Sequence, residues 1–335
     1  MVYNSMKEKF SNRISKLQIW SRTDNTLRDV SSSASDITWK TDLTTATELT
    51  FNFVKSKNSF TPNNGDQVSF AWNGDQVFTG WIFKTKLTND EKWEITAYAN
   101  SRYLKGTGTY VWQASSSAER FERIMKDLRL EYSIDDRSSY RVADEVTDGA
   151  TYFDMINSVI KETLHSTQQR FFLIDDPFGK IKHVSMENMQ TDLMIGDGAN
   201  LSTWSYDKSI EDMSNIIQVI HEDSNTKERE IKTAQDEQSI NNFGPLVHAE
   251  TVSGDVNSAQ LQDKANSLLR EKNGETRTLS LKSLGDVRVR AGTSLSLSIS
   301  DLFDSGIKQN QRILVKSCTH NFGVDWTMDM EVTLL

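Results

Sequence analysis

Cysteine is almost absent from this chain of 335 residues, which has a single one at position 318. One cysteine cannot form an internal disulfide, so packing must stabilise the fold, as expected for a protein made in a reducing cytosol. The sequence also lacks an apolar run of roughly 18 residues, and its N-terminal segment lacks the apolar core of a secretory signal. We therefore expect neither export by that route nor insertion into a membrane.

Basic residues are fewer than acidic ones: the chain has 38 Lys and Arg and 47 Asp and Glu, which gives a formal net charge of −9. Proteins that bind nucleic acids neutralise phosphates with Lys and Arg, so this balance argues against a specific nucleic-acid partner. The chain nevertheless has 8 Trp, 8 Tyr and 15 Phe, which indicates a folded protein. Its length allows two domains, each with its own core.

Residues suited to catalysis or metal binding are few and scattered. The histidines are His165, His183, His221, His248 and His320. They show no HExxH-type spacing, and there is no GxSxG motif, so we expect no metal site and no serine nucleophile of that type. Cys318 and His320 would suit a nucleophile and its base, but they share one face of a predicted strand with Leu314, which favours a structural role.

The acidic pairs and glycine-rich stretches are also interpreted as structural. Asp135-Asp136 and Asp175-Asp176 could be imagined as acid and base, but adjacent side chains in a turn point apart. Gly106–Gly108 and Gly196–Gly198 lack the Gly and Lys that follow in phosphate-binding loops. We therefore predict no catalytic residue, no cofactor and no metal site.

The tryptophans fall into two groups. Trp72, Trp93 and Trp326 lie in phase with apolar neighbours, which favours core packing over sugar stacking. Trp81 and Trp112 are less constrained and could lie at an interface.

Alternation of apolar and polar residues predicts strands in the first hundred residues. Around Leu17 and Ile19, around residues 49–53 and at Val68, Phe70 and Trp72 within 65–72, every second residue is apolar. Asn73-Gly74 then predicts a tight hairpin into a strand at 76–86, and residues 93–99 return after a polar turn. The segment is predicted to be an antiparallel meander.

Between residues 115 and 165 the apolar period lengthens to that of a helix. Ser116 and Glu119 are predicted to form a capping box at the start of one helix, and a second helix is predicted to begin at Thr151. Residues 131–150 between them are interpreted as acidic and irregular.

From Arg170 the strand pattern returns. A hairpin is predicted at 171–184 and strands at about 203–210 and 215–221, whereas residues 222–256 are interpreted as a long polar loop. A helix at about 258–272 precedes a final sheet, whose alternation is clearest at 295–299, 313–315 and 326–334.

The two β-rich regions have the same order of features. Gly65 to Phe70, a strand at 82–84 and the strand headed by Trp93 correspond to Gly292 to Leu297, a strand at 313–316 and the strand headed by Trp326. We therefore expect a mainly β protein with α insertions (α+β) that contains two related antiparallel β-barrel-like domains.

The expected domains follow from this duplication. They are a first tube-like β-barrel domain at 1–110, a helical and mixed α/β connecting domain at 111–200, and a second tube-like domain at 201–335 with a polar loop and helix insertion at about 222–275.

These features resemble a known family. Gly65-Asp66-Gln67-Val68, Phe78-Thr79-Gly80 and the stretch from Trp93 to Leu104 are similar to the N-terminal barrel of phage tail hub proteins of the XkdQ/YqbQ type. That family is related to phage late control protein D and to the N-terminal region of VgrG. Residues 313–322 with 326–332 resemble the family's closing strand pair, and Ser239-Ile240 with Phe243-Gly244 resembles a short signature ahead of it.

The resemblance implies a structural protein rather than an enzyme. It implies a hub in the tail baseplate of a phage or phage-like particle, with a contractile tail favoured, assembled in the bacterial host cytoplasm. Three copies would form a ring whose two barrels per chain match a sixfold tail tube above and a threefold spike below. The implied partners are further copies of the chain, the tail tube, central spike and tape-measure proteins, and other baseplate and wedge proteins.

Two other functions stay open at this point. A carbohydrate- or receptor-binding tail module would need exposed tryptophans in a groove, and a peptidoglycan hydrolase would need catalytic carboxylates. The chain has no recognisable lysozyme, peptidase or spike segment, so we expect wall-degrading activity to reside in other proteins. The residues do not distinguish an infectious phage from a tail-like bacteriocin.

Overall fold

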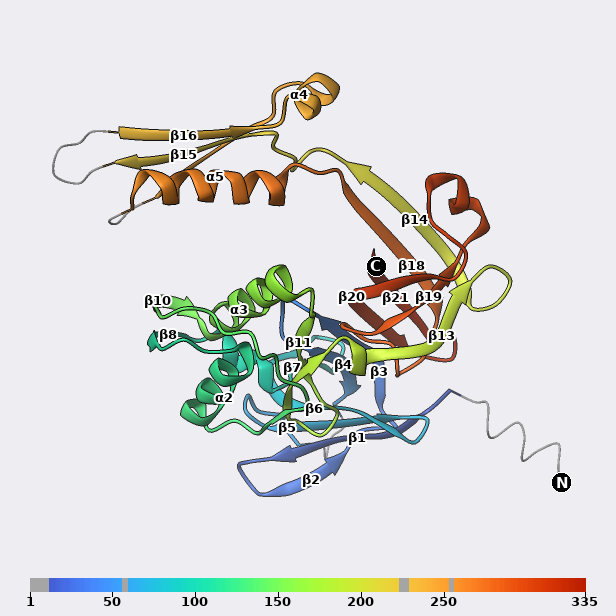
Figure 1. Ribbon diagram of the computed structural model, residues 1–335. Coiled ribbons are helices and arrows are strands. Elements are labelled where there is room, and N and C mark those ends of the chain that lie inside the picture. Colours follow the sequence, from blue (N-terminus) through green and yellow to red (C-terminus); the bar gives the residue numbers. More distant parts are fainter. Residues whose placement is uncertain (1–11, 56–59, 223–228, 253–255) are drawn as a thin grey trace. The chain divides into compact units, whose positions relative to one another are not determined.

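The structure is a computed structural model that describes residues 12–55, 60–222, 229–252 and 256–335 (Figure 1). The chain divides into two compact units. The first extends to Trp204 and resumes with Ser280–Leu335, and the second is Ser205–Leu279. The predicted class, a mainly β protein with α insertions, is confirmed. In the described ranges no helix is both long and apolar enough to cross a membrane.

One large sheet of 13 strands organises the first β-rich region and the C-terminal strands. In order across the sheet the strands are β14 (Leu201–Ser209), β18 (Thr276–Leu284), β21 (Thr327–Leu334), β20 (Gln311–Phe322), β3 (Ala34–Asp42), β4 (Glu48–Val54), β7 (Lys92–Tyr98), β6 (Asp75–Leu87), β5 (Gln67–Trp72), β1 (Ile14–Ser21) and β2 (Thr26–Asp29). Two further strands complete it, β19 (Ser294–Ser298) beside β20 and β13 (Gln190–Gly196) beside β19.

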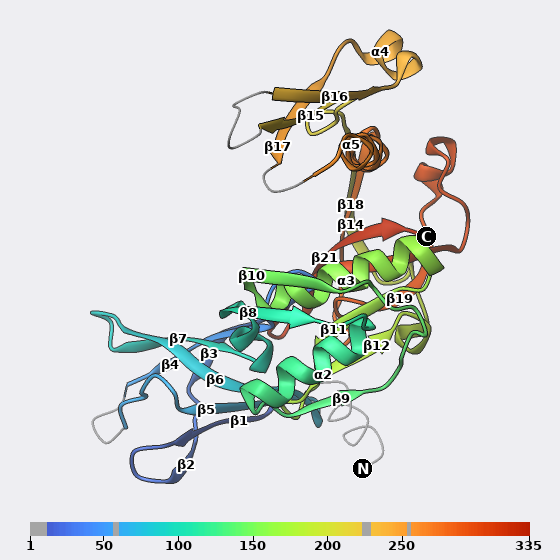
Figure 2. The same cartoon turned by 60° about the vertical axis from the view of Figure 1, so that its left-hand side comes forward.

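The expected pair of barrels is not seen as closed barrels in the part of the chain that the structure describes. β3 pairs antiparallel with β20 on one side and with β4 on the other. Because this ladder joins the N-terminal strands to the C-terminal strands, both β-rich regions share one open sheet (Figure 2). Residue alternation could not foresee this, since it reports which face of a strand is buried and not which strand lies beside it.

Within the sheet the two β-rich regions have the same strand order, β4-β7-β6-β5 in one and β18-β21-β20-β19 in the other. β5-β6-β7 and β19-β20-β21 are both antiparallel meanders. Each starts after a glycine with positive φ, Gly65 at 91° and Gly292 at 90°. Each long middle strand has a register shift, next to Phe83 in β6 and next to Lys316 in β20.

The core of the first region contains the residues that alternation predicted to be buried. Val68 and Phe70 are 0% exposed and Trp72 is 2% exposed. Phe322 and Trp326 from the C-terminal strands pack against the same cluster, and the ring centroids of Trp72 and Trp326 are 5.8 Å apart. Burial of one such aromatic side chain contributes about 1.5–3 kcal/mol, so the C-terminal strands help to stabilise the N-terminal core.

The middle of the chain adds two helices and two small sheets to the first unit. The helices are α2 (Ser117–Leu128) and α3 (Tyr152–Thr167), with short 3₁₀ turns η1 (Asn100–Lys105) and η2 (Glu187–Met189). The sheets are β8 (Thr107–Trp112) with β10 (Glu145–Thr151), and β11 (Phe171–Asp175), β12 (Ile181–Ser185) and β9 (Tyr132–Ile134). Apolar side chains of α2, α3, β11 and β12 form one core.

The interpretation of residues 131–150 as irregular is wrong at both ends. β9 pairs parallel with β12, and β10 pairs antiparallel with β8. β9 is short and β10 is largely exposed, so the apolar alternation of both strands is weak. The predicted capping box is confirmed, because Ser116 accepts from the Glu119 backbone and Glu119 accepts from the Ser116 backbone.

The second unit is a three-stranded sheet with α5 (Ser258–Lys272) on one face. β15 (Ile216–Glu222) lies between β16 (Arg229–Gln235) and β17 (Val247–Val252), and α4 (Glu237–Phe243) connects the two edge strands. Ile217 and Val219 of β15 pack against Leu261 and Ala265 of α5.

The prediction of a long polar loop at 222–256 is therefore wrong for 229–252. Residues 223–228 and 253–255 lie outside the described residues. The sequence resembles a polar loop here because β16 and β17 are edge strands with mostly exposed or half-exposed side chains, so only their pairing with β15 reveals them.

Candidate functional site

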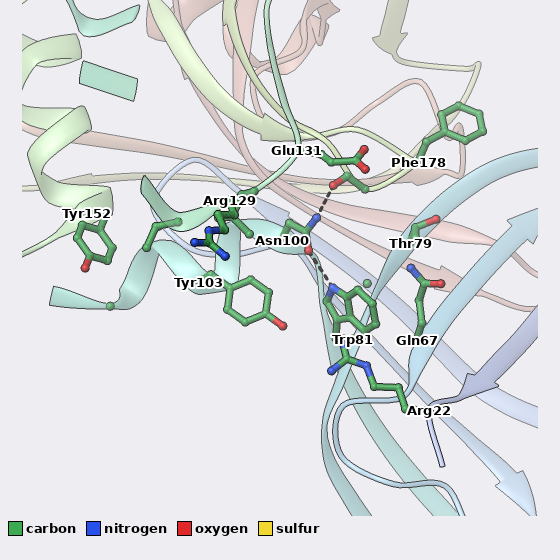
Figure 3. Close-up of a pocket in the computed structure, with 15 residues that line it drawn as sticks. Arg22, Gln67, Thr79, Trp81, Asn100, Tyr103, Arg129, Glu131, Tyr152 and Phe178 are labelled. Atoms are coloured by element: carbon green, nitrogen blue, oxygen red, sulfur yellow. Dashed lines mark hydrogen bonds between the residues drawn. The ribbon is translucent and has the colours of Figure 1, made fainter. Parts of the chain in front are cut away.

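A pocket of about 650 Å³ opens in the first unit where several segments meet (Figure 3). Strands β5 and β6 and the turn after β1 form one wall. η1, the end of α2 and the start of α3 form another, and the turn between β11 and β12 forms the rim. We call it the Trp81 pocket.

Trp81 of β6 is held from two sides. Its indole Nε1 donates a hydrogen bond to the side-chain oxygen of Asn100 at 2.9 Å. The guanidinium carbon of Arg22 lies 4.3 Å from the centre of the ring, a cation–π contact. Because Arg22 covers one face of the ring, that face offers no stacking platform for a sugar.

The turn between β11 and β12 is fastened to the pocket wall. The Thr79 hydroxyl donates to the carbonyl of Pro177 at 2.8 Å, and the Asn100 amide donates to the carbonyl of Gly179. Phe178 between them remains 73% exposed on the rim. A rigid turn thus presents an exposed aromatic side chain.

Gly80 lets this wall form. A Cβ at this position would lie 2.3 Å from the Tyr98 carbonyl oxygen and 2.5 Å from the Phe78 ring. Only glycine therefore fits between the strands beside Trp81.

Two arginines at the pocket, Arg22 and Arg129, lack an ion-pair partner among the described residues. Arg129 ends α2 in a left-handed conformation, with φ of 54°. Glu131 lies on the side of the β11–β12 turn, whereas Arg22 lies across the pocket beneath Trp81 (Figure 3). The pocket thus combines free cationic groups with aromatic side chains inside an acidic chain.

The Asp175-Asp176 pair forms a turn, as predicted. Asp176 accepts the backbone N–H groups of Phe178 and Lys180 at 2.8 and 2.9 Å. Asp175 points into the interior, where it accepts from the Ser101 backbone at 2.9 Å and the Ser101 hydroxyl at 2.6 Å. Burial raises the pKa of Asp175 in spite of these bonds.

Cys318 and His320 lie in contact on one face of β20, as predicted, and both are 0% exposed. The Cys318 Sγ and His320 Nε2 are 3.3 Å apart, and His320 Nε2 lies 2.8 Å from the carbonyl oxygen of Val289. A carbonyl can only accept, so Nε2 carries the proton and cannot take one from the thiol. Burial raises the pKa of Cys318 and lowers that of His320 to about 4.

Sequence reasoning missed a second buried histidine contact. The hydroxyl of Ser117, at the start of α2, lies 3.0 Å from His183 Nε2, and His183 Nδ1 lies 2.9 Å from the Asp136 carbonyl oxygen. Since that carbonyl must accept, Nδ1 donates and Nε2 accepts from Ser117. Ser117 and His183 are both 0% exposed, so the contact fastens α2 to β12 and is closed to a substrate. No spacing in the sequence signals it.

The remaining residues singled out from the sequence have packing roles. A Cβ at Gly108 would lie 2.6 Å from the Tyr152 ring, and one at Gly196 would lie 2.5 Å from the Ser298 carbonyl oxygen.

Trp112 is 2% exposed, so the suggestion that it lies at an interface is wrong, because its ring packs into the core beneath α2. Asp135 forms an ion pair with Lys182 at 3.2 Å. Within the described ranges no three His, Cys, Asp or Glu side chains cluster as metal ligands would.

Comparison with known proteins gave consistent matches. The family model described as YQBQ-like matches residues 37–333. The chain is 26% identical over 275 residues to the uncharacterized protein YqbQ of Bacillus subtilis (strain 168), covering 79% of this chain and 82% of that one. It is 26% identical over 277 residues to the phage-like element PBSX protein XkdQ of the same organism, covering 82% of each.

Solved structures share the fold. The 43 kDa tail protein of prophage MuSo2 from Shewanella oneidensis has a TM-score of 0.69 and 10% identity, over 95% of this chain and 98% of that one. An E. coli component of the type VI secretion system, described as similar to the T4 tail proteins gp27 and gp5, has a TM-score of 0.55 and 10% identity. That match covers 97% of this chain and 76% of the other.

Proposed function

The chain belongs to the YqbQ-like family, and we propose that it is the structural hub of a phage or phage-like tail baseplate. The observation that carries the proposal is the family match over residues 37–333, which includes most of both β-rich regions and all of the second unit. The relative XkdQ is a protein of a phage-like element, which supports a place in a phage-like particle made in the bacterial cytoplasm.

In this hub, three copies form a ring between the sixfold tube and the threefold spike of a contractile tail. The repeated strand order supports this, because two similar meanders per chain give a threefold ring six similar elements. We assign the two tube-like domains to 1–110 and 201–335 and the connection to 111–200. The ring contacts the tail tube, central spike and tape-measure proteins, together with the baseplate and wedge proteins.

The role proposed is structural, without catalysis. The Cys318–His320 and Ser117–His183 contacts, which resemble nucleophile–base pairs, are sealed in the interior. Trp81, which lines the Trp81 pocket, has Arg22 stacked on one face of its ring, which gives no support to a sugar-binding module.

The copy number in the particle tests this function. A tagged chain should copurify with tail particles from the host, and quantitative mass spectrometry should give three copies per tail against six tube subunits per ring. Deletion of its gene should abolish complete tails, and a plasmid copy should restore them. Absence from the particle, or six copies per tail, would contradict the proposal.

A further inference from the structure

We propose that neighbouring copies of this chain contact each other head to tail, with the turn η3 (Ser300–Ser305) of one copy in the Trp81 pocket of the next. The inference rests on the proposed ring and names the surfaces that join it. It follows from two features of the first unit that carry opposite charges and exposed aromatic side chains.

The pocket supplies two arginines, Arg22 and Arg129, against one carboxylate, Glu131, beside aromatic side chains. The Arg22 guanidinium is held against the face of the Trp81 ring, and the Arg22 backbone N–H donates to Asp66 at 3.1 Å. A guanidinium positioned in this way keeps its N–H groups available for a carboxylate. Tyr103, which is 40% exposed, and Phe178 provide apolar surface beside it.

The turn η3 carries the opposite charge around an aromatic side chain. Asp301 and Asp304 are exposed, and neither forms an ion pair in the described part of the chain. Phe303 between them is 42% exposed, whereas Leu302 is 2% exposed and anchors the turn. Asp197 accepts the backbone N–H and the hydroxyl of Ser300, both at 2.7 Å. The turn is therefore held in place before any partner arrives.

The two surfaces carry complementary groups. Two free arginines face two free aspartates, and an exposed Phe faces a pocket lined by Trp and Tyr. Aromatic side chains and Arg carry much of the binding energy at protein interfaces, and opposite charges fix the register. The pocket's volume of about 650 Å³ exceeds that of a single Phe side chain.

The placement of the two surfaces favours a ring over a symmetric dimer. η3 lies in the loop between β19 and β20, which is apart from α2 and β6 in both views (Figures 1 and 2). A contact between two different patches is heterologous, so it continues from copy to copy and gives a ring where the rotation closes and a filament where it does not. Closure after three copies gives the ring of the proposed function.

Engineered cysteines test the contact directly, because the natural Cys318 is buried. F178C and F303C chains, mixed and oxidised mildly, should form a disulfide dimer joined 178 to 303, while neither variant alone should form one. The double variant F178C/F303C should give a covalent closed trimer on a non-reducing gel. V324C is the control, since Val324 is 88% exposed and lies in neither surface, so it should not link to F178C.

Charge reversal tests the electrostatic match. R22E/R129E and D301K/D304K should each weaken association at least 10-fold, and combining all four substitutions in one chain should restore it, because every pocket and turn is then again oppositely charged. R270E, at an exposed arginine of the second unit, should leave association unchanged, and circular dichroism melts should show that all variants fold. The measurement is light scattering over a concentration series at low and high salt.

The outcomes separate this contact from the hub itself. Trimers or particles that contain the chain but give no 178–303 link would overturn the contact and leave the hub in place. Linking of 178 to 324 in equal yield, or 178–178 dimers alone, would also overturn it. A 178–303 link in a chain that enters no particle would support the contact and contradict the hub.

Discussion

His183 and His320 are buried side chains whose protonation would be costly in the folded protein. Burial lowers the pKa of each imidazole to about 4 from the ordinary 6.5. Between these values the unfolded chain binds a proton at each site and the folded chain does not, so stability falls as the pH falls from 6.5 toward 4. Each residue contributes on the order of 3 kcal/mol to this loss.

Urea unfolding at several pH values measures the effect. The free energy of unfolding should decrease across this window, and His320→Gln should make the decrease shallower. Equal stability at pH 6.5 and 4.5 would show that the buried imidazoles accept protons in the folded state.

At the scale of the element, α2 depends on its first turn. The Ser116 hydroxyl accepts the Glu119 N–H at 3.3 Å, and the Glu119 carboxylate accepts the Ser116 N–H at 2.8 Å. Ser116→Ala should lower the free energy of unfolding by about 1 kcal/mol, whereas Ser116→Asp should retain most of it because a carboxylate caps equally well. Chemical denaturation measures both, and equal losses for Ala and Asp would contradict a capping role.

Elements differed in how far the sequence could predict them. Strands buried on one face, such as β5 and β21, show strong alternation and were predictable, as was the capping box of α2. Edge strands were not: in β16 only Ala234 is buried, so its sequence looks like a polar loop. Strand partners such as β3 and β20 are set by tertiary pairing, which alternation does not encode.

The pocket was predictable only in part. The alternation of apolar residues does not determine whether Trp81 is buried, which marks it as a candidate interface residue, and Trp81 does line the pocket. Arg22, Arg129 and Phe178 come from separate segments, and the sequence gives no sign that folding brings them together. A local sequence pattern can indicate an unusual residue, but a site built from several segments can be recognised only once the fold is known.

At the scale of the whole molecule, the shared sheet couples the two β-rich regions. Phe322 of β20 packs on Phe70 and Trp72 of β5, with ring centroids 4.9 Å from each. Phe322→Ala should therefore remove about 3–5 kcal/mol and loosen β5 as well as β20. The second unit has its own core around Ile217 and Leu261, so it should keep its protection.

Hydrogen exchange read by mass spectrometry distinguishes coupled from independent regions. In the Phe322→Ala variant, amides of β1, β4 and β5 should exchange faster together with those of β20 and β21, since one sheet and one aromatic cluster join them. Phe243→Ala, at a 44% exposed side chain of the second unit, is the matched control and should change the exchange of neither the N-terminal nor the C-terminal strands. Faster exchange confined to 311–334 would mean that the β3–β20 ladder does not transmit stability. The N-terminal strands would then fold without their C-terminal partners, and each β-rich region would be a separate cooperative unit.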